Sequence, residues 1–361
     1  MIRTQSVGRA LACASIAASI AAACAAPAQA GSIRARIAGD QKVTAATAIE
    51  RDTHGSDGVV SRNYSGRVAG DEVVFDNLPD AGSFDLRLET AGGLIAGWNA
   101  AVTGAQYVLH IASPMGAAGL SDKQTIAAAR EGTLRVLRAA VDAGVTRVVA
   151  TSSTAACTPP KPLERAIDEG DWTDPDEPGL AAYRRSKVLA ERAAWEFMAG
   201  KPTTLTTLLP GAIFGPVLTR GRLGSVSILQ RLLEGQPPAL PRLGFNITDV
   251  RDLAEMHLAA MTSAAAAGER FIILGEALWY GEVAQTLRKR LGPAAAKVPT
   301  ANMPDVVARG LAVASPQMKA LLPLLGRTQK FSADKARRVL GYAPRPARDT
   351  VADTGASLVA S

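Results

Sequence analysis

The sequence is poor in the residues that build metal sites, disulfide frameworks and nucleic-acid-binding surfaces. It has only three cysteines and three histidines, at Cys13, Cys24, Cys157, His54, His110 and His257. Their spacing fits neither a zinc site nor a disulfide framework, so we expect no metal. Aromatic residues make up 4% of the chain, and the basic residues behind the net charge of +7 are scattered. This footprint argues against nucleic-acid binding.

The first thirty residues resemble a secretory signal in their order of segments. Arg3 and Arg9 precede an alanine-rich apolar run over residues 10–26, and Pro27 to Ala30 supply small residues for cleavage after Ala30. The run is too short for a confident membrane span. We therefore expect a periplasmic or secreted protein without a membrane anchor after signal removal. A frayed alanine-rich helix in a cytoplasmic protein is the alternative.

Residues 31–98 show short alternating segments separated by turn residues, for example over 43–49, 66–75 and 83–88. The cluster 77–82, with Pro79 and Gly82, is typical of a turn. This pattern predicts a small antiparallel all-β domain of six or seven strands. Residues 71–79 and 84–86 loosely resemble the carboxypeptidase-regulatory-like β-sandwich modules of exported bacterial proteins.

From about Trp98 the pattern changes to strands alternating with helices. Apolar runs predict buried strands at 107–113, 145–151 and 205–209, and a helix is expected over 122–143, ending at Gly144. A second helix carries Tyr183 and Lys187, with Leu189, Ala193 and Phe197 as its core stripe. The acidic loop 168–178 is expected to be a solvated face. Such alternation predicts a doubly wound parallel sheet that binds ligands at the carboxyl ends of its strands.

The most informative stretch is 183–187, Tyr-Arg-Arg-Ser-Lys, about thirty residues after the hydroxyl cluster 151–153. Tyrosine and lysine four residues apart share one helix face, and a nearby ammonium lowers the pKa of a phenol. A serine hydroxyl from a strand end would hydrogen-bond the same substrate oxygen. Such a trio moves a proton on or off a carbonyl or alcohol oxygen. An incidental pair on a solvated helix face is the alternative.

Together with 110–114, 132–137, 171–172, 210–216, 249–252, 331–332 and 340–341, these residues resemble the extended short-chain dehydrogenase/reductases. Within that group they are similar to the NAD-dependent epimerase/dehydratase kind, and most of all to the dihydroflavonol reductase-like aldehyde and ketone reductases. The resemblance covers residues 97 to 361 and implies a Rossmann-like fold.

The resemblance also assigns roles to individual residues. It implies Tyr183 as general acid/base, Lys187 on the nicotinamide ribose and Ser153 on the substrate oxygen, although Ser152 could take that place because alternation at the strand end decides it. It further implies contacts with the cofactor, NADP or NAD, from a larger set: His110, Ala112, Ser113, Tyr183, Lys187, Pro210, Gly211 and Ile213.

The sequence departs from this family at its start. No strand, glycine-rich turn and helix precede residue 107, although that unit normally binds the pyrophosphate. We therefore expect an incomplete doubly wound sheet without its first β-α-β unit, and weak dinucleotide binding. The predicted function is NAD(P)H-dependent reduction of a small aldehyde or ketone, and the assembly considered is a homodimer. The alternatives are an exported, non-catalytic scaffold with a silent reductase remnant, and a fused reading frame.

Overall fold

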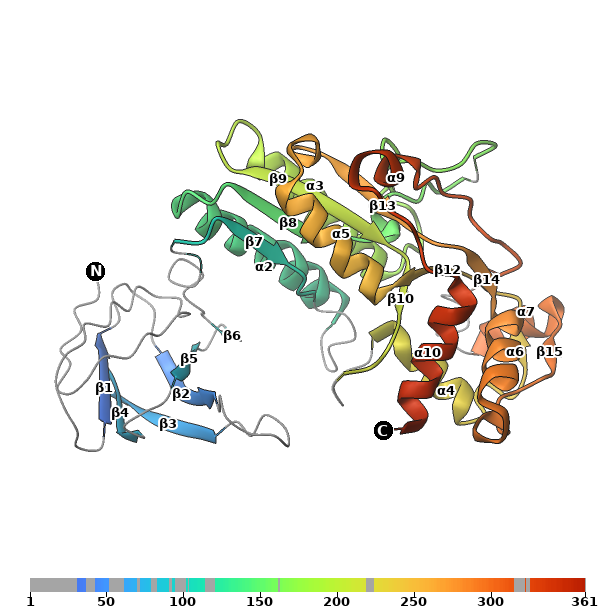
Figure 1. Ribbon diagram of the computed structural model, residues 1–361, viewed down its shortest axis with the longest axis horizontal. Coiled ribbons are helices and arrows are strands. Elements are labelled where there is room, and N and C mark those ends of the chain that lie inside the picture. The colour runs from blue at the N-terminus through green and yellow to red at the C-terminus, as the bar shows by residue number, and fades with distance from the viewer. Residues whose placement is uncertain are drawn as a thin grey trace. The chain divides into compact units, whose positions relative to one another are not determined.

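The structure is a computed structural model, shown in Figure 1. It describes the strands of residues 31–94 and then residues 102, 104–113, 121–161, 163–218, 224–314, 322 and 325–360. The signal-like segment 1–30 and the expected domain boundary near Trp98 lie outside these residues. The chain divides into two compact units, one of residues 1–108 with 135–145 and one of 109–134 with 146–361.

The first unit contains six strands that form one antiparallel sheet, in the order β1-β4-β3-β2-β5-β6. Their bounds are β1 Gly31–Arg36, β2 Val43–Arg51, β3 Arg62–Ala69, β4 Glu72–Leu78, β5 Ser83–Thr90 and β6 Gly93–Leu94. The single segment expected over 66–75 is instead divided between β3 and β4. These two strands pair with each other, Arg67 opposite Val74, and turn-forming Gly70-Asp71 stands between them in the sequence.

The second sheet has four strands in the order β13-β9-β8-β7. They are β7 Tyr107–His110, β8 Arg147–Thr151, β9 Thr204–Pro210 and β13 Arg270–Ile273, and β9 runs parallel to both β8 and β13. The three strands β8, β9 and β13 are buried almost throughout. This burial was predicted for the segments that form β8 and β9. The helix α2, Asp122–Asp142, confirms the helix expected over 122–143, and Gly144 adopts a φ of 68° after its end.

Strand β7 is not buried on both faces, contrary to the prediction for residues 107–113. Leu109 is 38% exposed and Ile111 just beyond the strand is 59% exposed. Among the described residues β7 is the last strand at its end of this sheet. An apolar run shows only that a strand can be buried, whereas its position in the sheet decides how much of it is covered.

Alternation along β9 sends successive side chains to two helical layers. Leu208 packs with Leu253 and Met256 of α5, Val250–Thr262, on one face. Thr207 donates a hydrogen bond to Glu191 of α3, Ala182–Met198, on the other. In Figure 1, α5 lies in front of β8 and β9. Helices on both faces of a parallel sheet confirm the predicted Rossmann-like α/β fold.

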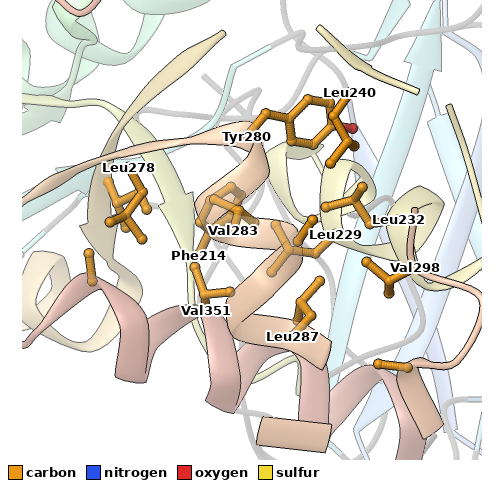
Figure 2. Packing of buried hydrophobic residues seen from close by; sticks show 14 residues of the cluster. Phe214, Leu229, Leu232, Leu240, Leu278, Tyr280, Val283, Leu287, Val298 and Val351 are labelled. Carbon is orange, nitrogen blue, oxygen red and sulfur yellow. The ribbon is translucent and has the colours of Figure 1, made fainter. Parts of the chain in front are cut away.

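A second core lies beyond the carboxyl end of β9, where a three-stranded sheet has the order β10-β12-β14. Its strands are Ala212–Phe214, Gly244–Asp249 and Ala277–Trp279, and helices α4 Ser227–Leu233, α6 Tyr280–Leu291 and α10 Ala347–Ala360 accompany them. Figure 2 shows Phe214, Leu229, Leu287 and Val351 packed together between these elements. The described residues also form strands β11 Leu240–Pro241 and β15 Asn302–Met303 and helices α7 Asp305–Ala314 and α9 Asp334–Leu340.

Candidate active site

Helix α3 presents the side chains that the sequence singled out. Tyr183 is half-buried and Lys187 is 8% exposed, and the Lys187 ammonium lies 6.0 Å from the centre of the Tyr183 ring. The core stripe expected at Leu189, Ala193 and Phe197 is only partly right. Leu189 and Phe197 are half-buried, because the buried face is centred about one position later, at Ala190, Ala194 and Met198, and includes Lys187 and Glu191. That face carries Lys187 and Glu191 beside apolar residues such as Val188, Ala194 and Met198.

Tyr183 and Ser153 meet at the carboxyl end of β8. Burial raises the pKa of the Tyr183 phenol, and a hydrogen bond with the Ser153 hydroxyl opposes that rise. The Ser153 side chain also caps the short helix Thr154–Ala156 by accepting a hydrogen bond from the backbone nitrogen of Ala155, at 3.2 Å. The lowered phenol pKa expected from the neighbouring lysine is therefore not found, because loss of hydration dominates. A phenol in this state is protonated at neutral pH and suits proton donation.

Ser152 points the other way. Its hydroxyl donates a 2.5 Å hydrogen bond to the Glu191 carboxylate, and its side chain is buried against α3. Of the two serines that the sequence left open, Ser153 is the one placed beside Tyr183.

Lys187 and His110 act on each other electrostatically, and burial affects both side chains. Burial, together with the Lys187 charge, lowers the pKa of His110 to about 4, so that imidazole is neutral. Its Nε2 lies 3.2 Å from the Thr133 hydroxyl. Burial lowers the pKa of Lys187 to about 8, and the charge of Glu191 counteracts this effect. No ion pair to Lys187 occurs within the described part of the chain, so its N–H groups face the site with donors to spare.

Glu191 is a residue that the sequence analysis missed. Its carboxylate is 4% exposed and accepts hydrogen bonds from Ser152, Thr207 at 2.8 Å and the Nε of Arg270 at 2.8 Å. It therefore links the hydroxyl cluster after β8 to β9 and β13 through one buried charge. Its place could have been predicted from spacing. Glu191 follows Lys187 by four residues, as Lys187 follows Tyr183, so all three lie on one face of the helix.

The acidic loop 168–178 is only in part the solvated face that was expected, since Asp174 and Asp176 are exposed but Asp171 and Glu169 have partners. Asp171 accepts two hydrogen bonds of 2.7 Å from the Arg165 guanidinium, and Glu169 accepts one from the backbone nitrogen of Ile272. The Arg270 guanidinium donates to backbone oxygens of this loop and lies 3.7 Å from the ring centre of Trp172. The basic partners are Arg165, just before the loop, and Arg270, about a hundred residues after it. The composition of the loop itself therefore does not reveal them.

The segment after β9 is tightly fitted. Gly211 donates a 3.0 Å hydrogen bond to the Thr248 hydroxyl, and a β-carbon there would lie 2.2 Å from the backbone oxygen of Asn246. Glycine at this position thus allows the close approach of β10 and β12. Pro210 ends β9 and is buried, whereas Ile213 packs partly against the α5 side of the core. Ala112 and Ser113, which follow β7, are exposed.

No cluster of three or more His, Cys, Asp or Glu side chains in the described residues could hold a metal ion. None of the helices in the same residues is long and apolar enough to span a membrane.

Comparison with known proteins identifies the family to which these residues belong. Residues 90–274 match the NAD dependent epimerase/dehydratase family. The chain belongs to this family. The match covers the strands and helix that carry Ser153, Tyr183 and Lys187, and it confirms the family expected from the sequence. The nicotinamide dinucleotide expected as cofactor agrees with the family's NAD dependence.

Individual relatives are reductases. The chain is 32% identical to cinnamoyl-CoA reductase 1 of rice (Oryza sativa subsp. japonica) over 198 residues, which are 54% of this chain and 57% of that protein. It is 26% identical to the ketoreductase azaE of Aspergillus niger over 321 residues, 83% of this chain and 85% of the relative. The chain thus spans little more than half the length of the cinnamoyl-CoA reductase.

Solved structures share the fold. The yeast methylglyoxal/isovaleraldehyde reductase Gre2, complexed with NADPH, superposes with a TM-score of 0.61 at 24% identity, over 73% of this chain and 79% of that one.

Three residues of this chain fit the nicotinamide end of such a cofactor. Lys187 offers a buried ammonium with donors to spare, as a ribose hydroxyl requires, and Tyr183 and Ser153 stand beside it. The pyrophosphate end has no comparable support, because no glycine-rich turn between a strand and a helix occurs in the described residues.

Proposed function

We propose that this protein is an NAD(P)H-dependent oxidoreductase that reduces a small aldehyde or ketone with Ser153, Tyr183 and Lys187. The observation that carries the proposal is the meeting of a protonated, buried phenol with a serine hydroxyl and an ammonium at the carboxyl edge of a parallel sheet. The family and its reductase relatives support it. When bound, the cofactor supplies the hydride.

The residues of the chain handle the proton. The Ser153 hydroxyl donates a hydrogen bond to the substrate oxygen and holds it against the Tyr183 phenol. Tyr183 then gives its proton to that oxygen as the negative charge develops, and the Lys187 ammonium stabilises the phenolate that remains. The neutral His110 adds no positive charge at pH 7 that would disfavour the protonated lysine.

The chain is expected to bind the dinucleotide weakly. Backbone N–H groups at a glycine-rich turn supply much of the pyrophosphate recognition in such sheets. That turn belongs to a β-α-β unit whose strands would pair beside β7, but β7 is the outermost strand at its end of the described sheet. The same observation favours a second candidate function, a non-catalytic scaffold that retains the reductase residues without using them.

A fluorescence titration of the purified full chain with NADPH separates the two functions. Quenching that saturates, together with oxidation of NADPH in the presence of an aldehyde, supports the reductase. Absence of quenching up to millimolar NADPH supports the scaffold. Tyr183→Phe removes only the transferable proton, so we expect it to abolish reduction while the cofactor still binds. Equal turnover by wild type and variant would contradict the role assigned to Tyr183.

A further inference from the structure

A cavity of about 500 Å³ lies between the loop that follows Ser153 and the segment that precedes α9. It is lined by residues of 159–167 and 326–330, by Glu177 and Arg184, and by the ring of Trp279. Two of these elements, the loop after β8 and helix α3, also carry the serine and tyrosine of the candidate active site. The volume is in the range that holds small organic ligands.

The lining is unusually rich in positive charge. Five of the fifteen lining residues are basic and two are acidic. Arg165 is engaged by Asp171, but Lys161, Arg327 and Lys330 have no ion pair among the described residues. They are exposed at the cavity, so they raise the local potential for an anion without being neutralised.

Arg184 is the cation that lies deepest. Its only hydrogen bond in the described part of the chain is a long one, 3.3 Å from Nη2 to the backbone oxygen of Thr158, although a guanidinium has five N–H donors. Burial lowers the pKa of the Arg184 guanidinium, because it removes hydration, and the charge of Glu177 opposes that shift. The neighbouring Arg185 is better satisfied, with Nε 2.8 Å from the backbone oxygen of Pro175.

Glu177 shares the cavity without neutralising Arg184. The two side chains form no ion pair within 4 Å, and the buried Oε2 of Glu177 has no hydrogen-bond partner. Its negative charge nevertheless acts on Arg184 and would oppose an incoming anion. Pro159, Ile167 and the Trp279 ring offer apolar surface around these charges.

We propose that this cavity binds the acid group of a small organic anion, a carboxylate or a phosphate, with Arg184 as its inner donor and Lys161, Arg327 and Lys330 at its mouth. Resting on the proposed reductase function, the inference names the substrate class: a carbonyl compound that carries an acid group at the end remote from its reacting oxygen. Guanidinium donors suit both acid groups because their planar geometry matches paired oxygen acceptors.

The test measures binding by calorimetry to the full chain without NADPH, so its result does not depend on turnover. The probes are 4-carboxybenzaldehyde, its neutral methyl ester and 4-formylphenyl phosphate. We expect at least one of the two acids to bind about tenfold or more tightly than the ester, as loss of a charge-assisted hydrogen bond implies. The tighter acid identifies the group, and equal binding of acids and ester overturns the proposal.

Three variants assign the effect to the cavity. Arg184→Gln should remove the preference for the acid, while Arg185→Gln, the same change one position further along α3 and outside the cavity lining, should keep it. Glu177→Gln should tighten acid binding, because it removes a negative charge from the wall. If Arg184→Gln and Arg185→Gln behave alike, the proposal is wrong. If the acid binds through Arg184 but no aldehyde is reduced with NADPH, the proposed function fails and the cavity assignment stands.

Discussion

The Glu191–Arg270 pair gives the sharpest test of how the active-site residues are held. The two side chains are 2% and 9% exposed and lie 2.8 Å apart, and Glu191 is also the acceptor for Ser152 and Thr207. Glu191→Gln would leave the Arg270 charge buried without its counterion. Breaking a buried pair in this way costs about 3–5 kcal/mol.

Arg270 keeps its bonds to the backbone oxygens of Glu169 and Asp171 and its stacking on Trp172, so we expect the lower end, about 3 kcal/mol. For a domain of this size that corresponds to a fall in melting temperature of about 6–12 °C. Thermal and urea unfolding measure the change, with Glu196→Gln, an exposed position on the same helix, as the control.

A double variant separates pairing from packing. Glu191→Met with Arg270→Met removes both charges, and we expect it to regain most of the stability lost in Glu191→Gln. A second readout reports on catalysis, because Glu191 is the group that raises the pKa of Lys187. Removal of the Glu191 charge should lower the pH at which the rate of carbonyl reduction begins to fall on the alkaline side, which is the alkaline limb of the pH profile. The reasoning fails if Glu191→Gln costs less than about 1 kcal/mol, well below the range for a broken buried pair, or leaves that limb in place.

Two further predictions concern the same residues. The rate of carbonyl reduction should fall as pH rises through about 8, because the lowered pKa of Lys187 removes its charge there and the phenolate loses its stabilising partner; a rate that is flat from pH 7 to 10 at saturating NADPH would contradict this. Ser153→Ala should lower kcat by about 10²–10³, as loss of an oxyanion donor does, whereas Ser152→Ala should mainly lower the melting temperature, because Ser152 bonds Glu191 rather than facing Tyr183. The reverse pattern would exchange the roles of the two serines.

The sequence predicted features that depend on neighbouring residues, such as strands and helices. It predicted fewer of the contacts between residues far apart in the chain. The buried strands β8 and β9 and the helix α2 follow from apolar runs and a terminal glycine, and the shared face of Tyr183 and Lys187 follows from their spacing. The exposure of Leu109 could not be predicted, because it depends on whether another strand lies beside β7.

The buried charge network escaped the sequence for a related reason. Arg270 stands 79 residues after Glu191, and only the parallel register of β9 with β13 brings it to the carboxylate. Arg165 and Asp171 are only six residues apart, so their pairing could have been predicted from the sequence. The sequence analysis instead predicted that the loop containing Asp171 is solvated. Spacing identifies partners on one helix and fails for partners that a sheet brings together.

The two halves of a dinucleotide site rest on different parts of this fold, and this separates affinity from chemistry. Tyr183, Lys187 and Ser153 are held by α3 and by β8, an interior strand whose residues are almost all buried, and by the Glu191 network behind them. The pyrophosphate half would depend on elements beyond β7, the strand at the end of the described sheet. Loss of phosphate contacts lowers the affinity for free cofactor, whereas the barrier to proton transfer depends on the residues that touch the reacting oxygen. Weak binding of NADPH and an intact arrangement of the three residues proposed to be catalytic are therefore compatible in one chain.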